Sequence, residues 1–326
     1  MAARRRVGAV LALLSLGVFL LLPRLVGTYT LLTLTRLLLL ALMAIGWNFV
    51  GGFAGYASFG NAAFFGVGAY ATGLLMLSSA RVPFLPALAC GALLCAGTAA
   101  LLGLPILRLK GHYFAIATLG VAEAARQIAD TWDGVTQGST GIDLPMQADG
   151  TVFYWTALAL VVGGTLLTAR LARSKVGYAW MAIREDEDAA RTAGIPTTRY
   201  KVLAYALSAA FSGLAGGITA YQNVHVTPTD FFKLDYTLES IIAVVIGGAG
   251  TVFGPVIGAA VFELLSTFVW SHFLELHPTV LGLLIIFFVV FVPRGIVSVV
   301  GAVRARRGRG LRWRDLFANI RENRVT

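Results

Sequence analysis

Long apolar runs, separated by short polar segments, make up most of this chain. Runs of about 20 residues are long enough to cross ~30 Å of hydrocarbon as α-helices. They do not alternate between apolar and polar residues as membrane β-strands do. The pattern therefore predicts an all-α polytopic membrane protein. The helices are expected at residues 7-22, 29-50, 62-79, 84-107, 113-129, 152-171, 202-222 and 279-300.

A ninth apolar stretch, 239-270, is interrupted by glycines. If every other run crosses the membrane once, this stretch must enter and leave on the same side, or cross twice as short helices. The total is then about 8 to 10 transmembrane helices, of which the two in the stretch 239-270 would be short.

Two glycine-rich stretches break the helix pattern in a similar way, at 51–70 and 247–258. Each carries Phe-Gly followed by Asn or Pro. Glycine at this density unwinds a helix, and the freed amides need partners other than lipid. The glycines that we assign to the broken segments are Gly55, Gly60, Gly66 and Gly68 in the first stretch, and Gly247, Gly248, Gly250 and Gly254 in the second.

Broken segments at corresponding places in two halves indicate an internal repeat, such as an inverted repeat, that lines a solute path. The alternative is that these glycines only let helices pack closely. If a path exists, position alone selects its lining residues: Ser58, Asn61, Phe65 and Tyr70 from the first stretch and Thr251 from the second.

Composition supports a membrane location. Hydrophobic residues make up 57% of the chain, charged residues 13%, and the mean hydropathy is +0.78, whereas soluble domains are about 25% charged. Cys90 and Cys95 share one apolar run without metal or redox spacing, so we expect small buried side chains. The N-terminal arginines and run 7-22 are similar to a signal peptide, but without a clear cleavage site a retained helix is expected.

The net charge of +10 follows the apolar runs rather than a nucleic-acid surface. Basic clusters next to spans indicate the cytoplasmic side, which places both termini and the loop 172-201 inside. The loop 130–150 has four aspartates and no Lys or Arg, so it fits the outside. We divide the chain into a transmembrane domain, 1-303, and a basic cytoplasmic tail, 304-326, that contacts anionic lipid or a partner.

Four charged residues fall within apolar runs: Arg36, Glu123, Arg126 and Glu263. An ionised group there costs about 3 kcal/mol on insertion scales, so it should face protein or water. Glu123 and Arg126 are three apart and can pair. We expect that pair near a helix end, reaching the interface, with a pathway charge or subunit contact as the alternative. Arg36 can snorkel, and Glu263 is a candidate partner contact.

A charged island, residues 184–194, lies between two long apolar runs. It contains an acid, two alanines and a glycine four residues after the second alanine, which predicts a compact helix followed by a turn. Basic residues flank it on both sides, so it must lie outside the bilayer on the positive side. A docking element for a cytoplasmic motor has these properties.

Motifs for independent chemistry are missing from the sequence. None of the four lysines follows a glycine, so the phosphate-binding G-x-x-x-x-G-K-[ST] motif does not occur. No His-Glu-x-x-His set occurs either, and the spans carry no assembled acid–base pair. We therefore expect neither a metal site nor enzymatic activity, and no ATP site in this chain.

Several motifs carry a family resemblance. They are the run 55–70, the run 111–120 with 138–142 after it, the residues 177–187, and the terminal Phe-Val-Pro-Arg-Gly at 291–295. In this order they resemble the LivM-type permeases, membrane subunits of ABC importers for branched-chain amino acids. The resemblance runs from about residue 30 to residue 296.

The resemblance implies an assembly in the cytoplasmic membrane of a prokaryote. A second permease subunit, two cytoplasmic ABC ATPases that bind the ATP, and an extracytoplasmic solute-binding protein complete it. The island then matches the importer coupling loop, with aspartate where glutamate is commonest. Its residues are Arg184, Glu185, Glu187, Asp188, Ala189, Ala190 and Gly194.

The function implied is uptake of a branched-chain amino acid or a similar small polar solute, without a cofactor in this chain. Similar subunits import urea and short amides, so that substrate class stays open. A stand-alone secondary transporter or channel would also use broken helices, but it has no need of the charged island. An intramembrane enzyme is disfavoured by the missing catalytic set.

Overall fold

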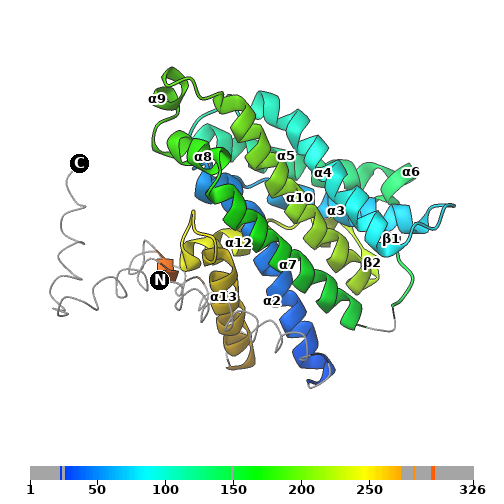
Figure 1. Ribbon diagram of the computed structural model, residues 1–326. Coiled ribbons are helices and arrows are strands. Elements are labelled where there is room, and N and C mark those ends of the chain that lie inside the picture. The colour runs from blue at the N-terminus through cyan, green and yellow to red at the C-terminus, as the bar shows by residue number, and fades with distance from the viewer. Residues whose placement is uncertain (1–22, 24–25, 148–149, 273–281, 283–294, 298–326) are drawn as a thin grey trace, which may run out of the picture.

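The computed structural model describes residues 23, 26–147, 150–272, 282 and 295–297. In this part of the chain, long helices run side by side in a bundle (Figure 1). They are α2 (Thr28–Trp47), α3 (Asn61–Leu77), α4 (Phe84–Ile106), α5 (His112–Thr131), α7 (Thr151–Ala172), α10 (Thr197–Asn223), α12 (Leu234–Gly247) and α13 (Gly254–His272).

These helices confirm the all-α prediction. Four segments are long and apolar enough to cross a membrane, namely 28–53, 84–106, 151–172 and 197–223, and α3 and the segment 254–269 are shorter apolar helices. Helix α5 coincides with the run expected at 113-129. The helix expected at 7-22, most of that at 279-300, and the tail 304-326 lie outside the described residues.

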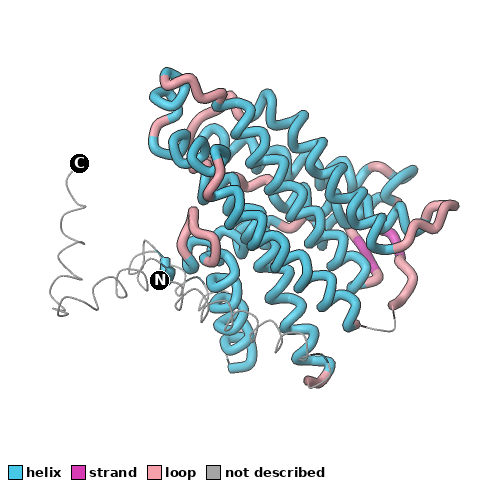
Figure 2. Tube along the Cα trace, in the orientation of Figure 1, coloured by secondary structure: helices cyan, strands magenta, loops and turns pink. Residues whose placement is uncertain are grey.

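Short elements gather at two opposite ends of the bundle (Figures 1 and 2). One end, called here the α9 end, carries α8 (Lys175–Glu185) and α9 (Glu187–Thr192). The other, called the β end, carries β1 (Ile142–Asp143) and β2 (His225–Val226), which pair antiparallel with Ile142 opposite Val226. The π-helix η1 (Asn48–Phe53), α6 (Asp133–Thr136), η2 (Gly138–Thr140) and α11 (Pro228–Phe231) complete the list.

Helix α10 is the centre of the bundle and packs against α2, α3 and α4. Glycines permit this packing, because a methyl group on Gly68 of α3 would overlap the backbone of Gly213 of α10. Large buried side chains, including Tyr205, Phe49 and Trp180, fill the space toward the α9 end. The core therefore fixes the start of α10 and the elements around α8 in one packed unit.

The apolar stretch 239-270 consists of two helices, α12 and α13, joined by the non-helical residues 248–253. They pack on each other and on α2 (Figure 1). The first glycine-rich stretch is also broken, since the α-helix ends at Trp47, a π-helical turn follows, and residues 54–60 are not helical. Both predicted interruptions are present.

Candidate functional site

Helix α9 forms the charged island at one end of the bundle. Asp186 caps its N-terminus, where its Oδ1 accepts hydrogen bonds from the backbone N–H groups of Asp188 (2.9 Å) and Ala189 (3.0 Å). The helix ends at Thr192, and Gly194 follows at φ +83°, a conformation that glycine adopts without strain. The compact helix and the turn predicted from the sequence are therefore both present.

The island residues divide into two faces. Glu185, Asp188, Ala189 and Gly194 are exposed, whereas Glu187 and Ala190 are buried. Ala190 belongs to an apolar cluster with Ile183 of α8, Tyr205 of α10 and Phe114 of α5. One face of α9 is thus available for another protein, while the opposite face is packed into this one.

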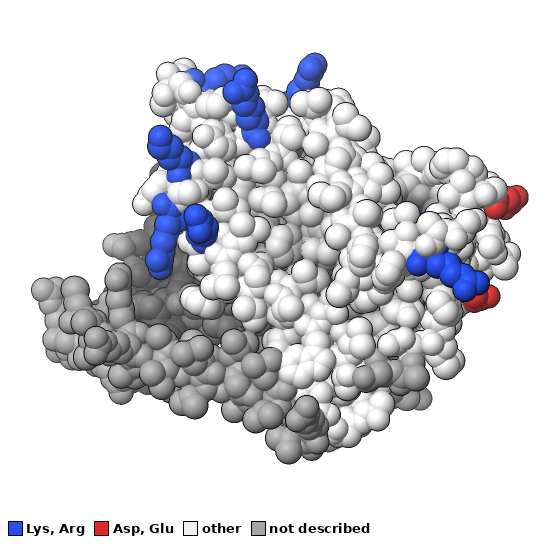
Figure 3. All heavy atoms as spheres, turned by 45° about the vertical axis from the view of Figure 1, so that its right-hand side comes forward, with Lys and Arg blue, Asp and Glu red and all other residues white. Residues whose placement is uncertain are grey.

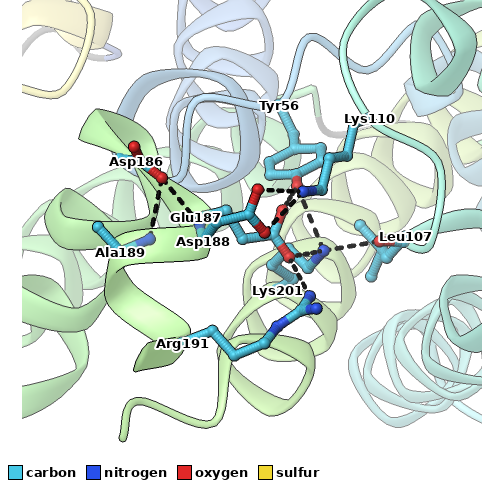
Figure 4. A network of polar contacts seen from close by, with 9 residues as sticks. All are labelled: Tyr56, Leu107, Lys110, Asp186, Glu187, Asp188, Ala189, Arg191 and Lys201. Atoms are coloured by element: carbon cyan, nitrogen blue, oxygen red, sulfur yellow. Dashed lines mark hydrogen bonds and ion pairs between the residues drawn. The ribbon is translucent and has the colours of Figure 1, made fainter. Parts of the chain in front are cut away.

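Glu187 is the polar anchor of the buried face (Figure 4). Its side chain is 8% exposed, and Lys201 Nζ of α10 donates a hydrogen bond to Oε1 over 2.7 Å. The hydroxyl of Tyr56 donates to Oε2, and Arg191 adds a longer contact of 3.2 Å. Lys201 Nζ also donates to the carbonyl of Leu107 at the end of α4 (2.7 Å). Three segments therefore meet at one carboxylate, and Lys201 connects the end of α4 to them.

The environment of Glu187 keeps it ionised. Burial by itself raises the pKa of this carboxyl, but the hydrogen bonds from Lys201 and Tyr56 outweigh burial and leave the pKa below its ordinary value. Burial and the neighbouring carboxylate raise the pKa of Tyr56, so its phenol remains a proton donor. The anchor is a buried ion pair with satisfied hydrogen bonds, the arrangement in which such a pair is tolerated.

An exposed ion pair joins α9 to the start of α5. Lys110 Nζ lies 2.8 Å and 2.9 Å from the two carboxylate oxygens of Asp188. Each group shifts the other toward its charged form, with the pKa of Asp188 lowered and that of Lys110 raised. Both side chains are more than half exposed, so solvent screens the pair and it contributes little to stability.

The two broken segments meet beside α8. The amide of Asn48 donates from Nδ2 to the carbonyl of Thr251 (2.9 Å), and its Oδ1 accepts from the backbone N–H of Gly250 (2.8 Å). Arg184 of the charged island donates from Nη1 to the carbonyl of Gly52 over 2.6 Å. We call Asn48, Gly52, Arg184, Gly250 and Thr251 the junction. It links α8 directly to the first interruption and, through Asn48, to the second.

The glycines of the broken segments serve two purposes. Gly55, Gly248 and Gly250 have positive φ angles, so they permit backbone turns that other residues rarely make. Gly66 and Gly68 lie within α3, where a methyl group would overlap Phe232 and Gly213. Close helix packing therefore accounts for Gly66 and Gly68, and backbone turns account for Gly55, Gly248 and Gly250. Gly60, Gly247 and Gly254 are also in close contact with neighbouring groups.

The residues expected to line a solute path lie in packed surroundings. Asn61 is fully buried and its Nδ2 donates to the hydroxyls of Ser208 (3.1 Å) and Ser212 (3.0 Å) of α10. Phe65 stacks on Tyr236 with ring centroids 4.2 Å apart, and the hydroxyl of Tyr70 donates to the carbonyl of Val226 (3.2 Å). These contacts explain their burial through helix packing, and their role in a path stays a prediction.

The other two path candidates stabilise the breaks themselves. Ser58 is buried; its Oγ accepts from the N–H of Gly60 (3.2 Å) and its carbonyl from the indole of Trp47 (2.8 Å). Thr251 donates to the carbonyl of Gly248 (2.7 Å) and accepts from the N–H of Gly254 (3.1 Å). Both hydroxyls satisfy backbone groups that a broken helix leaves free.

Sequence reasoning assigned no role to Asn48, Gly52 or Tyr56, and it did not pair Lys201 with Glu187 or Lys110 with Asp188. An amide within the apolar run 29-50 was an available signal for Asn48, because a buried amide needs partners. Among the described residues, no group of three or more His, Cys, Asp or Glu side chains could hold a metal ion. The arrangement connects the exposed helix α9 and its neighbour α8 to the two helix interruptions through hydrogen bonds.

Comparisons with known proteins place this geometry in context. A family model described as the permease component of branched-chain amino acid transport systems matches residues 29–289. The high-affinity branched-chain amino acid transport system permease protein LivM of Escherichia coli (strain K12) is 32% identical over 304 aligned residues, which cover 84% of this chain and 70% of the relative.

Two more distant relatives match shorter parts of the chain. The probable branched-chain amino acid transport permease protein LivM of Methanocaldococcus jannaschii is 25% identical over 49% of each chain. The ribose import permease protein RbsC of Bacillus subtilis is 33% identical over 34% of this chain and 35% of its own. No solved structure was found to match this chain.

Proposed function

We propose a specific transport role on one premise: this chain belongs to the family of permease components of branched-chain amino acid transport systems. It is accordingly a multi-pass membrane protein and a subunit of a transporter. The proposal concerns what it carries, what drives it and how its helices respond. The observation behind it is that Arg184 and Glu187, both in the charged island, contact the first broken segment of the bundle.

The chain would act in the cytoplasmic membrane of a prokaryote, with the α9 end and both termini in the cytoplasm. Figure 3 supports this orientation, because most of the Lys and Arg side chains on the face shown lie toward the α9 end. The Asp and Glu side chains visible on that face lie at the opposite end, together with one basic side chain. The transmembrane domain would be 1-303, followed by the basic tail 304-326. A second permease, two ABC ATPases and an extracytoplasmic binding protein would complete the importer.

The ATPases would bind the exposed surface formed by Glu185 at the end of α8 and by Asp188 and Ala189 of α9. When two ATPases close around ATP, a docked helix is displaced as a rigid body. The Glu187 anchor would pass this motion to Tyr56 and to α10, and Arg184 would pass it to Gly52. Rigid elements joined by non-helical segments can switch between two arrangements, one open to each side.

The solute would be a branched-chain amino acid. The LivM protein of Escherichia coli, named for high-affinity transport of these amino acids, is similar over most of this chain. The ribose permease is similar over only 34% of it, so a sugar is the weaker candidate. Selectivity would reside mainly in the binding protein.

Deleting the second half of α9 and the turn after it tests this role. In a transporter assembled from co-expressed subunits, removal of residues 189–194 should abolish co-purification of the ATPases and ATP-dependent uptake of L-leucine. The control is Lys110→Gln, which removes the exposed ion pair with Asp188 but keeps all residues of α9. It should retain both ATPase co-purification and leucine uptake. Retention of ATPases and uptake by the deletion variant would contradict the proposal.

A further inference from the structure

Two neighbouring helices present very different outward faces. The exposed large side chains of α4 are all leucines, at positions 85, 93, 94, 101, 102 and 104. The exposed side of α5 also has large apolar side chains, among them Ile116 and Ile128. Unlike α4, however, it carries an ion pair: Glu123, with 63% of its side chain accessible, and the partly exposed Arg126, with Gln127 beside them. Leucine is suited to hydrocarbon, whereas ionised groups are costly there.

The charged pair of α5 lies well inside the helix. Lys110, just before α5, is bound to α9, and the strand β1 that follows α5 is paired with β2 at the far end of α10. The helix therefore runs between the α9 end and the β end of the bundle. Glu123 is the twelfth of its 20 residues, about 16 Å from the start and 12 Å from the end at 1.5 Å per residue. This depth favours a pathway charge over a pair at a helix end.

The pair does not join α5 to another described helix. Arg126 Nε donates to both carboxylate oxygens of Glu123, at 3.1 Å and 3.2 Å, and the two residues are on the same helix. Lys233, at the start of α12, is likewise paired with a residue three positions away, Asp230 (2.8 Å). Because each pair is formed by neighbours on one segment, a charged solute group could replace one partner without separating two helices.

A cavity of about 400 Å³ lies where these groups converge, between α5 and the segment from α11 to the start of α12. Its lining combines one carboxylate, two cations and apolar side chains. The chief members are Leu119, Glu123, Arg126, Phe232, Lys233 and Leu234. None of the five path residues expected from the sequence is among its lining residues.

We propose that this cavity is a subsite for an amino-acid zwitterion on the solute path, and that the outward face of α5 meets water and the second permease instead of lipid. The solute carboxylate would bind Arg126 and Lys233, its ammonium group Glu123, and its aliphatic side chain Leu119 and Phe232. Both signs of charge beside apolar surface match an apolar amino acid. The inference rests on the proposed import function and gives that function a location.

Thiol accessibility tests the face in the assembled transporter. In a Cys90→Ala background, Ala124→Cys or Gln127→Cys places a thiol on the exposed side of α5, and Leu94→Cys or Leu101→Cys places one on α4. A charged, membrane-impermeant maleimide should label the α5 positions at least about tenfold faster, and L-leucine with its binding protein should slow that labelling. Equal rates on the two helices, or labelling that leucine does not affect, would overturn the inference.

Uptake measurements test the charges. Glu123→Gln, Arg126→Gln and Lys233→Gln should each lower L-leucine uptake about tenfold or more while ATP hydrolysis by the complex continues. Arg81→Gln, which removes an exposed charge between α3 and α4, should not. The swap Glu123→Arg with Arg126→Glu keeps an ion pair but reverses its polarity, so uptake should stay low; recovery would indicate a merely structural pair and overturn the subsite.

The two proposals fail separately. If the wild-type chain shows no ATP-dependent leucine uptake with its partners, the import function itself is wrong. If wild-type uptake is normal and Glu123→Gln and Arg126→Gln match it, only the subsite is wrong.

Discussion

Glu187 of α9 and Lys201 of α10 form a buried ion pair with 2.7 Å between Oε1 and Nζ, and both side chains are less than a tenth exposed. The pair lies beneath the exposed face of α9 and at the start of a helix that spans the bundle. It shares the carboxylate with Tyr56 of the first broken segment. A displacement of α9 would therefore be passed through this carboxylate to α10 and to the first broken segment.

Breaking the pair on one side should destabilise the protein. Lys201→Met leaves Glu187 buried with only the longer ion-pair contact to Arg191. Removing one partner of a buried ion pair costs about 3–5 kcal/mol, and the remaining contact to Arg191 should place the loss at the lower end. The thermal midpoint of the purified transporter measures the loss. The double variant Glu187→Gln with Lys201→Met removes both charges and should recover part of it, whereas Lys110→Gln at the exposed pair should change little. A Lys201→Met midpoint equal to that of the wild type would show that the buried pair is not an anchor.

Acidification should weaken the same anchor. The pKa of Glu187 is lower in the folded protein than the ordinary 4.5. Its contribution is therefore fully present above pH 4.5 and is lost as the pH falls through the folded-state pKa. The difference in thermal midpoint between the wild type and Glu187→Gln should stay constant from neutral pH to about pH 5 and shrink below that. A difference that vanishes already near pH 6 would refute this assignment.

Asn48→Ala should uncouple the junction. It removes both hydrogen bonds that join η1 to the second broken segment and leaves the N–H of Gly250 and the carbonyl of Thr251 without that partner. The loss should be about 1–3 kcal/mol in stability, and leucine uptake should fall relative to ATP hydrolysis. Thr98→Val, a polar-to-apolar change on α4 away from the junction, is the control. An unchanged ratio of uptake to hydrolysis would show that the junction does not transmit motion.

Asn61→Ala separates a path role from a packing role. Substitution should lower uptake while the complex still assembles. The variant with Ser208→Ala and Ser212→Ala keeps Asn61 but removes its partners. A packing role predicts similar losses for both variants, and a path role predicts a larger loss for Asn61→Ala. Wild-type uptake by Asn61→Ala would remove this residue from the path.

Within the described residues, hydropathy predicted the long helices well, and local signals predicted α9. Aspartate caps, alanine and a closing glycine act over six to nine residues, so the sequence displays them directly. Glycine clustering placed the two interruptions, although the first starts earlier than expected, with a π-helical turn from Asn48. Helix α10 also starts earlier than residue 202, because the polar turn from Thr197 to Lys201 is helical without being apolar.

The contacts that give the site its function could not be predicted in this way. Asn48 and Thr251 are 203 positions apart, and Tyr56 and Glu187 are 131 apart. Such pairs depend on how the helices pack, which hydrophobic periodicity does not specify. The charge pair on α5 was expected, but its exposure toward a cavity required the neighbouring segments to be placed around it.

The central claim is that partner ATPases, acting through α9, drive solute through this chain. The most direct test is reconstitution of the permease pair in proteoliposomes with the binding protein and an outward leucine gradient, with and without the ATPases and ATP. The account predicts leucine accumulation against its gradient only when ATPases and ATP are both present. Uphill accumulation by the permeases without them would contradict it.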